Sequence, residues 1–192
     1  MDKFDEETVK LPFGKKDLDA VLCFPTSVRT DVHTAVILTH GAGGDMNFRH
    51  LDYLKTLQKF TIKHAFFGGR SMGCRAAAAL ARRLSDESED GVQGVICLSF
   101  PLHPPGQMHA HRQRSEDLRM LPECVRVLFV SGTEDNMCDR DLFDGVLKDM
   151  KAEAEVFWLQ GGSHGLTVKG RSEESVMDEV NLKVISWIKK EV

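Results

Sequence analysis

The stretch Gly69-Arg70-Ser71-Met72-Gly73 decides how the chain is expected to fold. A short apolar run, Ala65-Phe66-Phe67, precedes it, and an alanine-rich segment at residues 75–81 follows it. The pattern therefore predicts a buried strand, a tight turn and a helix. In such a turn the residues two before and two after the serine crowd together, and glycine at both positions relieves the clash. The turn would present the Ser71 hydroxyl as a nucleophile at a helix N-terminus. The alternative is an ordinary glycine-rich turn with a solvated serine.

Short apolar runs alternate with helix-like segments along most of the chain. This alternation is typical of βαβ units, which build a mostly parallel sheet with helices on both faces. An opening hairpin is expected from residues 8–11 and 18–24. Further strands are expected at 35–38, 65–67, 94–98, 125–130 and 155–159, and helices at 75–81, 139–150 and 176–188.

Composition narrows the class of protein. With 192 residues, 42% of them apolar, we expect a single domain over 1–192. The net charge of −4, without a basic run, argues against nucleic acid as a partner. No segment approaches the ~18 consecutive apolar residues of a membrane span. The cysteines are odd in number and widely spaced, which favours reduced thiols in a cytoplasmic protein, small enough to enter the nucleus as well. They are Cys23, Cys74, Cys97, Cys124 and Cys138.

A nucleophilic serine needs a base, and the base needs an acid to orient it. His164 lies in Gly161-Gly162-Ser163-His164-Gly165 after the last predicted strand, and Asp135 follows the strand before it. Both therefore lie at carboxyl ends of parallel strands, on the same sheet edge as Ser71. We predict a triad of Ser71, His164 and Asp135. Glu134 and Asp139 compete with Asp135, and an aspartate at such a turn can instead form an Asx-turn or cap a helix. A glycine-flanked histidine such as His164 can likewise be part of an exposed loop.

The same edge should also carry two backbone donors for an oxyanion. The residue after the nucleophile, Met72, is expected to supply one, and Ala42 or Gly43 in the loop His40-Gly41-Ala42-Gly43-Gly44 the other. That loop could instead be a plain strand-ending turn. Arg70 is a candidate substrate contact for an acidic group, although pairing with an acidic neighbour on the next loop is the simpler expectation.

Three histidines, His103, His109 and His111, lie close together in sequence. They occupy a stretch that contains proline and glycine and lacks a fourth ligand at a recognisable spacing. We therefore expect an exposed loop rather than a metal site, and no metal or organic cofactor.

Four blocks together resemble the α/β-hydrolase superfamily: residues 38–47, 67–73, 130–135 and 163–165. More narrowly they resemble the testis-expressed protein 30 family, which is similar to dienelactone-hydrolase-like enzymes and to a hydrolase-like domain in a nuclear histone acetyltransferase complex. The resemblance implies an α/β-hydrolase fold and assigns the triad roles to Ser71, Asp135 and His164. The superfamily includes enzymes and a relative regarded as a scaffold.

One departure from the superfamily pattern lies between the oxyanion loop and the serine turn. A helix, a strand and a second helix there need about 35 residues, and residues 46–64 provide 19. A helix is expected at 51–57, with no apolar strand after it. The chain therefore resembles a shortened form that lacks one strand and one helix, which would leave unpaired backbone groups in the sheet.

Two functions fit the sequence. The first is a serine hydrolase that cleaves a small carboxylic ester or another small-molecule acyl substrate with water and without a cofactor. The second is a non-catalytic hydrolase-like module with a protein partner, or an inactive shortened form. Neither the acyl group nor an oligomeric state is predicted.

Overall fold

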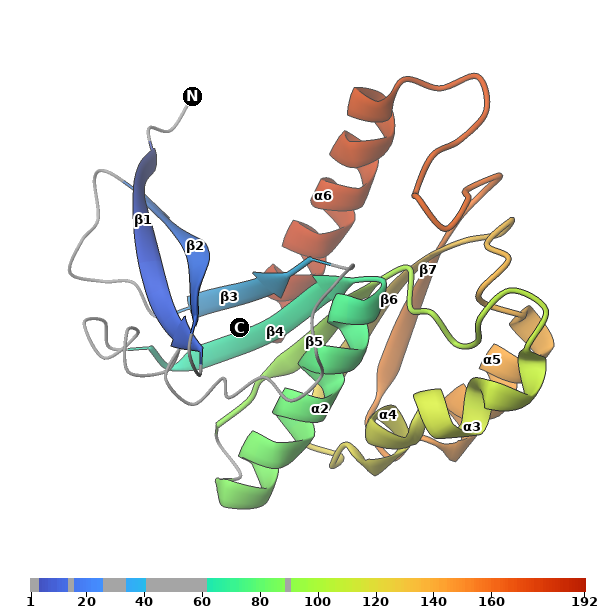
Figure 1. Ribbon diagram of the computed structural model, residues 1–192, viewed down its shortest axis with the longest axis horizontal. Helices are drawn as coiled ribbons and strands as arrows, with labels where there is room; N and C mark the ends of the chain where they lie inside the picture. Colours follow the sequence, from blue (N-terminus) through green and yellow to red (C-terminus); the bar gives the residue numbers. More distant parts are fainter. Residues whose placement is uncertain (1–3, 14–15, 26–33, 41–61, 89–90) are drawn as a thin grey trace. The chain divides into compact units, whose positions relative to one another are not determined.

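A computed structural model describes residues 4–13, 16–25, 34–40, 62–88 and 91–192 (Figure 1). The chain divides into two compact units, one formed by Met1–Ala35 and Asp45–His64 and the other by Val36–Gly44 and Ala65–Val192. Within the first unit, β1 (Phe4–Phe13) and β2 (Lys16–Pro25) form an antiparallel two-stranded sheet. The predicted hairpin is thus present, with longer strands than the sequence pattern indicated.

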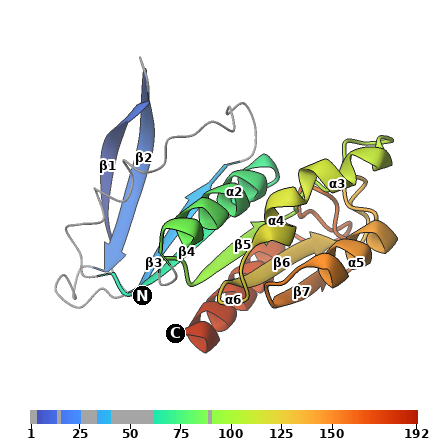
Figure 2. The same cartoon turned by 90° about the horizontal axis from the view of Figure 1, so that it is seen from below.

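The other sheet has five strands in the order β3-β4-β5-β6-β7 (Figures 1 and 2). Its pairs β4–β5, β5–β6 and β6–β7 are parallel, so these strands end on the same edge of the sheet. The strands are β3 (Thr34–Thr39), β4 (His64–Arg70), β5 (Gly94–Leu98), β6 (Arg126–Gly132) and β7 (Ala154–Leu159). All five predicted strands of this sheet are therefore confirmed.

In the described ranges, three longer helices connect the strands or follow them, and short helices lie between β5 and β6. The long helices are α2 (Met72–Glu87), α5 (Arg140–Asp149) and α6 (Glu173–Glu191). The short ones are η1 (Met108–Ala110), α3 (His111–Arg114) and α4 (Glu116–Met120). Figures 1 and 2 show α6 against one face of the five-stranded sheet and α2 against the other.

Successive side chains of β6 point to opposite faces of the sheet, and a separate hydrophobic core lies on each face. Leu128 and Val130 belong to the cluster that packs against Val176, Val180 and Trp187 of α6. On the other face the ring of Phe129 lies edge-on between those of Phe100 and Phe143, with centroids 6.3 and 5.0 Å away. Because β6 is buried on both faces, packing on each side fixes the position of the strand.

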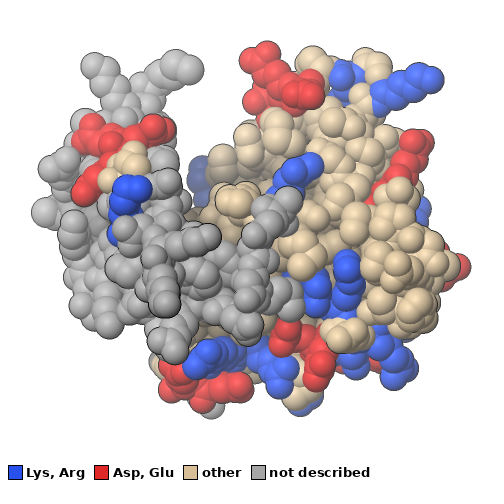
Figure 3. Space-filling model, in the orientation of Figure 1, with Lys and Arg blue, Asp and Glu red and all other residues tan. Residues whose placement is uncertain are grey.

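The surface of the described residues carries charges of both signs. On the face seen in Figure 3, lysine and arginine side chains lie among aspartate and glutamate side chains. In the part of the chain that the structure describes, no helix is long and apolar enough to cross a membrane. The helix expected at 51–57 lies outside the described residues, and the single domain over 1–192 stays a prediction.

Candidate active site

Ser71 connects β4 to α2 with a backbone conformation that L-residues rarely adopt. Its φ of 55° and ψ of −119° lie outside the helical and extended regions, and such strain costs on the order of 1–3 kcal/mol. The turn is held by the Ser71 N–H, which donates to the Leu98 carbonyl at 2.9 Å, and by the Cys74 N–H, which donates to the Ser71 carbonyl at 2.9 Å. The predicted strand–turn–helix arrangement is present.

The two glycines of the turn touch each other as the sequence pattern predicts. A Cβ on Gly69 would lie 2.4 Å from the carbonyl carbon of Gly73, far inside van der Waals contact. Thr39, at the end of β3, closes the space from the other side, since its Oγ1 donates to the Gly73 carbonyl at 3.2 Å. Thr39 was not singled out from the sequence, because nothing local distinguishes it from other strand-ending threonines.

The loops after β6 and β7 meet through their backbones. The Glu134 N–H donates to the Gly162 carbonyl at 2.8 Å, and the Gly161 N–H donates to Thr133 Oγ1 at 2.8 Å. A Cβ on Gly132 would lie only 2.0 Å from the Gly162 carbonyl oxygen. Sequence reasoning missed Gly132 and Thr133, and the turn signal Ser131-Gly132-Thr133 was the clue to them. This contact between loops brings Asp135 and His164 together.

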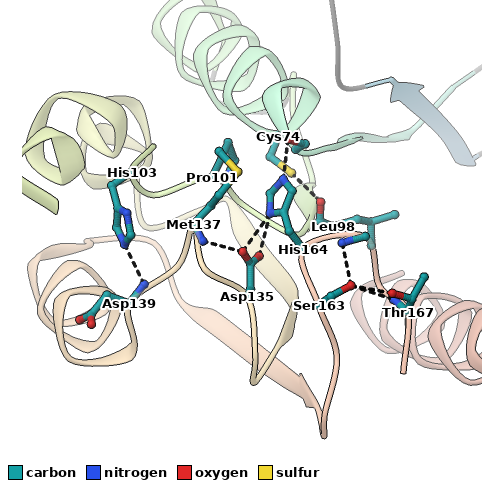
Figure 4. A network of polar contacts seen from close by, with 12 residues as sticks. Cys74, Leu98, Pro101, His103, Asp135, Met137, Asp139, Ser163, His164 and Thr167 are labelled. Carbon is teal, nitrogen blue, oxygen red and sulfur yellow. Dashed lines mark hydrogen bonds and ion pairs between the residues drawn. The ribbon is translucent and has the colours of Figure 1, made fainter. Parts of the chain in front are cut away.

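Ser71, His164 and Asp135 form a continuous chain of hydrogen bonds. Ser71 Oγ lies 2.8 Å from His164 Nε2. His164 Nδ1 lies 3.0 and 2.8 Å from the two carboxylate oxygens of Asp135 (Figure 4). Because a carboxylate only accepts, Nδ1 carries the proton and donates, which leaves the Nε2 lone pair facing the serine hydroxyl. In this tautomer His164 can take a proton from Ser71.

The neighbouring carboxylates do not compete for His164. Asp135 is 7% exposed, and its Oδ1 also accepts from the Met137 N–H at 2.8 Å. Glu134 is exposed. Asp139 caps α5, since its Oδ1 accepts from the Leu142 N–H at 3.0 Å. The helix cap is therefore the role of Asp139, whereas Asp135 Oδ1 makes the Asx-turn contact to Met137 in addition to its contact with His164.

Met72 is the first residue of α2, so its N–H has no carbonyl acceptor within the helix. None of the described residues accepts a hydrogen bond from this N–H. The positive end of the helix dipole lies at the same point, beside Ser71. The other two predicted oxyanion residues, Ala42 and Gly43, lie outside the described residues.

Arg70 is exposed at the end of β4. No acidic side chain in the described part of the chain pairs with it, so the acidic neighbour that we expected is not found there. One of its guanidinium nitrogens lies 3.7 Å from where a Cβ on Gly165 would be. The Arg70 guanidinium is therefore close to the backbone that follows His164.

Buried thiols lie under the site. Cys74 Sγ contacts the Gly69 and Leu98 carbonyls at 3.0 and 3.2 Å, and burial raises its pKa well above the usual value. Burial also raises the pKa of Cys138 to about 12, with a further contribution from the charge of Asp135. Both residues are therefore neutral thiols at physiological pH, poor nucleophiles and poor metal ligands.

The expectation of exposure is wrong for one of the three histidines. His103 is 4% exposed, and both of its ring nitrogens have polar partners in the structure. His109 lies in η1 and is exposed, and His111 begins α3. The segment that follows, α4, is anchored by the buried side chain of Leu118. Among the described residues, no group of three or more potential ligands is arranged to hold a metal ion.

The chain belongs to a known family. A family model described as an alpha/beta hydrolase domain matches residues 49–189, more than half of the chain. The five-stranded parallel sheet, with helices on both faces and the serine turn after β4, is the α/β-hydrolase fold that the sequence predicted.

Solved structures of esterases and of a dienelactone hydrolase are similar in fold. Est1E from Butyrivibrio proteoclasticus matches with a TM-score of 0.66 at 14% identity, over 95% of this chain and 99% of that chain. The dienelactone hydrolase from Anabaena variabilis matches with a TM-score of 0.64 at 15% identity, over 97% and 98% of the two chains. The esterase domain of a Rhodothermus marinus protein matches with a TM-score of 0.67 at 13% identity, over 97% and 98%.

Proposed function

We propose that this α/β hydrolase is a serine hydrolase that cleaves a small carboxylic ester or another activated acyl compound. The observation that carries the proposal is the hydrogen-bonded chain from Ser71 Oγ through His164 to Asp135. Three residues from three different loops meet in the order and geometry that acyl transfer requires. The esterase neighbours support the same class of reaction.

In the first half of the reaction, Ser71 Oγ attacks the acyl carbon while His164 Nε2 takes the hydroxyl proton. The Asp135 carboxylate accepts the hydrogen bond from Nδ1 and stabilises the imidazolium. The Met72 N–H at the start of α2 and, in this proposal, an N–H of Ala42 or Gly43 donate hydrogen bonds to the carbonyl oxygen, on which negative charge develops. The imidazolium then protonates the leaving oxygen, and the alcohol departs.

In the second half, water attacks the acyl-enzyme ester as His164 takes its proton. The tetrahedral intermediate collapses, the proton returns to Ser71 Oγ, and the carboxylic acid leaves. Water is the second substrate, and these steps call on no residue outside the described network except the second oxyanion donor.

Arg70 is proposed as the substrate contact. Its guanidinium is exposed beside Gly165, one residue after His164, and suits a carboxylate or another acidic group on the substrate. Replacing Arg70 with methionine keeps the length of the side chain and removes the charge. We expect kcat/KM to fall about tenfold for an ester that carries a carboxylate, a loss of about 1.4 kcal/mol, and to change little for its neutral analogue.

We also propose the narrower relationship to the testis-expressed protein 30 family, in a shortened form. The 19 residues of segment 46–64 are too few for the expected helix, strand and helix. Among the described residues β3 ends the five-stranded sheet, and Leu38 in it is 60% exposed. An unpaired edge is what the loss of a strand beside β3 would leave. This supports a low stability of the sheet, which thermal melting will measure.

The proposal is tested by labelling the purified protein with a fluorophosphonate, which reacts with activated serines. Wild type is expected to be labelled at Ser71, and Ser71→Ala and His164→Ala are expected to remain unlabelled while melting near the wild-type temperature. Asp135→Asn is expected to react about 10⁴-fold more slowly, because His164 would lose the acceptor that selects its tautomer. Ser163→Ala, in the same loop as His164, serves as the control for general damage to that loop.

A wild-type chain that melts cooperatively and shows no Ser71-dependent labelling refutes the hydrolase. The non-catalytic module, a hydrolase-like chain that acts through a protein partner, would then be the better account.

A further inference from the structure

His103 lies on the loop after β5, next to the loop that carries Asp135. It is 4% exposed, more buried than Asp135 itself. It makes none of the contacts in the Ser71–His164–Asp135 chain, so the proposed reaction leaves its buried imidazole without a role. A buried polar ring is kept in a fold when its hydrogen bonds are satisfied and specific.

Two hydrogen bonds connect His103 to the Asp135 loop, and Figure 4 shows the one that its ring makes. Its backbone N–H donates to the Met137 carbonyl at 3.1 Å. Its Nε2 accepts from the Asp139 N–H at 3.1 Å. His103 therefore holds the loop at two points, two residues beyond Asp135 through its backbone N–H and four residues beyond Asp135 through its imidazole.

The contacts of His103 select one tautomer. Because the Asp139 N–H donates to Nε2, this nitrogen has the lone pair and the ring proton lies on Nδ1. Nδ1 in turn donates to the Pro104 carbonyl at 2.9 Å. A proton moved to Nε2 would face the Asp139 N–H and leave two buried donors opposed. The neutral Nδ1–H ring alone satisfies both partners.

Met137 links the backbone of His103 to the carboxylate. Its C=O accepts from the His103 N–H, while its own N–H donates to Asp135 Oδ1 at 2.8 Å. The peptide groups of Met137 are thus held between His103 on one side and the acid on the other. Asp135 Oδ1 is also 3.0 Å from His164 Nδ1, so the orientation of the acid depends on both contacts.

We propose that His103 is a positioning residue for Asp135: its neutral imidazole clamps the 135–139 loop and so fixes the carboxylate that orients His164. The inference rests on the proposed hydrolase, because the acid matters only if His164 acts as a base. His103 does not touch the substrate or the reacting atoms. The imidazole acts on the Asp139 N–H, and the backbone of the 135–139 loop carries the restraint to Asp135. It should therefore act on the chemical step rather than on substrate binding.

Two variants separate the two ring nitrogens. The carboxamide oxygen of His103→Gln can reach the position of Nε2 and accept from the Asp139 N–H, whereas His103→Asn can reproduce only the shorter contact to Pro104. We expect His103→Asn to lower kcat for an ester substrate, and the rate of fluorophosphonate labelling, by about 10- to 100-fold, because a loop displaced by about 1 Å misplaces the acid. KM should stay within about twofold of the wild-type value, since the substitution removes no contact to the substrate. His103→Gln should remain within about threefold of wild type. His109→Asn, at an exposed histidine nearby, is the matched control and should be unchanged.

Hydrogen exchange gives a readout that does not need activity. The Asp139 amide is expected to be protected in wild type and His103→Gln, and to exchange faster in His103→Asn. If wild type is not labelled at Ser71, the proposed hydrolase fails, and the clamp is judged by this exchange. If the Asp139 amide exchanges equally fast in wild type, His103→Gln and His103→Asn, the clamp is overturned. If labelling and turnover slow equally in His103→Gln and His103→Asn, the role of Nε2 as an acceptor is overturned. Unchanged kinetics in a faster-exchanging His103→Asn overturns the positioning role.

A measurement on the unmodified protein completes the test if His103→Asn does not fold. The nitrogen chemical shifts of the His103 ring at neutral pH should report a proton on Nδ1 alone. A ring protonated on Nε2 refutes the clamp.

Discussion

Replacing Gly132 with alanine should separate the acid from the histidine without touching either. The new Cβ would lie 2.0 Å from the Gly162 carbonyl oxygen, 2.3 Å from its carbonyl carbon and 2.8 Å from the Ser163 carbonyl oxygen. All three are backbone atoms, so no side chain can rotate away. Gly132 itself does not need the left-handed backbone conformation, so the contact is the whole effect.

The size of the displacement follows from the contact. Ordinary van der Waals contact begins at 3.4 Å, so the Gly132 and Gly162 backbones must move apart by the difference, about 1.4 Å. If the whole movement reaches the site, the 2.8 Å between His164 Nδ1 and Asp135 Oδ2 becomes about 4 Å, which is beyond hydrogen-bond range. A misplacement of about 1 Å costs about 100-fold, and a lost acid function up to about 10⁴-fold. We expect kcat/KM to fall within that range and the free energy of unfolding to fall by about 1–3 kcal/mol.

The assay combines the rate of fluorophosphonate labelling with thermal melting, on wild type, Gly132→Ala and a control. Gly145→Ala is the control, since its Cβ would meet nothing within 4 Å in the helix α5. It should keep the wild-type rate and gain about 0.5–1 kcal/mol from the better helix former. A Gly132→Ala protein that reacts as fast as wild type would refute the claim that the contact between the two loops aligns Asp135 with His164.

Three further predictions concern titration and packing. At pH 8 iodoacetamide should alkylate the exposed Cys124 of the folded protein and spare Cys138, whose pKa burial raises to about 12, and mass spectrometry would contradict this if both reacted equally fast. The hydrogen bond from Lys183 lowers the pKa of Glu155, so this pair stabilises the fold above the unfolded-state pKa of about 4.3 and the contribution is lost as pH falls through the lower folded-state pKa. Glu155→Gln should therefore lower the free energy of unfolding by about 0.5 kcal/mol or less at pH 7, because the pair is partly exposed. The difference in melting temperature between wild type and the variant should vanish in acid. A difference that persists in acid would exclude the ion pair as its cause. Trp187→Ala should lower the free energy of unfolding by about 3–5 kcal/mol in urea titrations, because the buried ring lies edge-on to Phe66 at 5.6 Å, and a loss below 1 kcal/mol would show that α6 does not support the core.

The serine turn could be predicted from sequence because its determinants are local. Gly69 and Gly73 lie within four residues of each other, and the apolar run before them and the alanines after them specify strand and helix by their own periodicity. The structure adds the distances that make the glycines necessary, and the contact of Thr39 from β3. Where a feature depends on neighbours in sequence, the pattern was enough.

The choice among carboxylates needed the tertiary structure. Glu134, Asp135 and Asp139 share one loop and look alike in sequence. Asp135 is the partner of His164 because the backbones at Gly132 and Gly162 are in contact, whereas Asp139 caps α5. No local pattern encodes which of three carboxylates meets a histidine about thirty residues away, because that depends on how two loops pack.

His103 shows most clearly the difference between what local sequence predicts and what tertiary packing decides. In sequence it stands between Leu102 and Pro104, in a stretch with two further histidines that was expected to be an exposed loop. Only the fold places it against the 135–139 loop, where Asp139 supplies a donor and Pro104 an acceptor. The sequence by itself determined an α/β-hydrolase with a nucleophile turn at Ser71, because strand, turn and helix signals are short-range. Which side chains surround that serine was decided by contacts between distant segments, which only tertiary packing brings together.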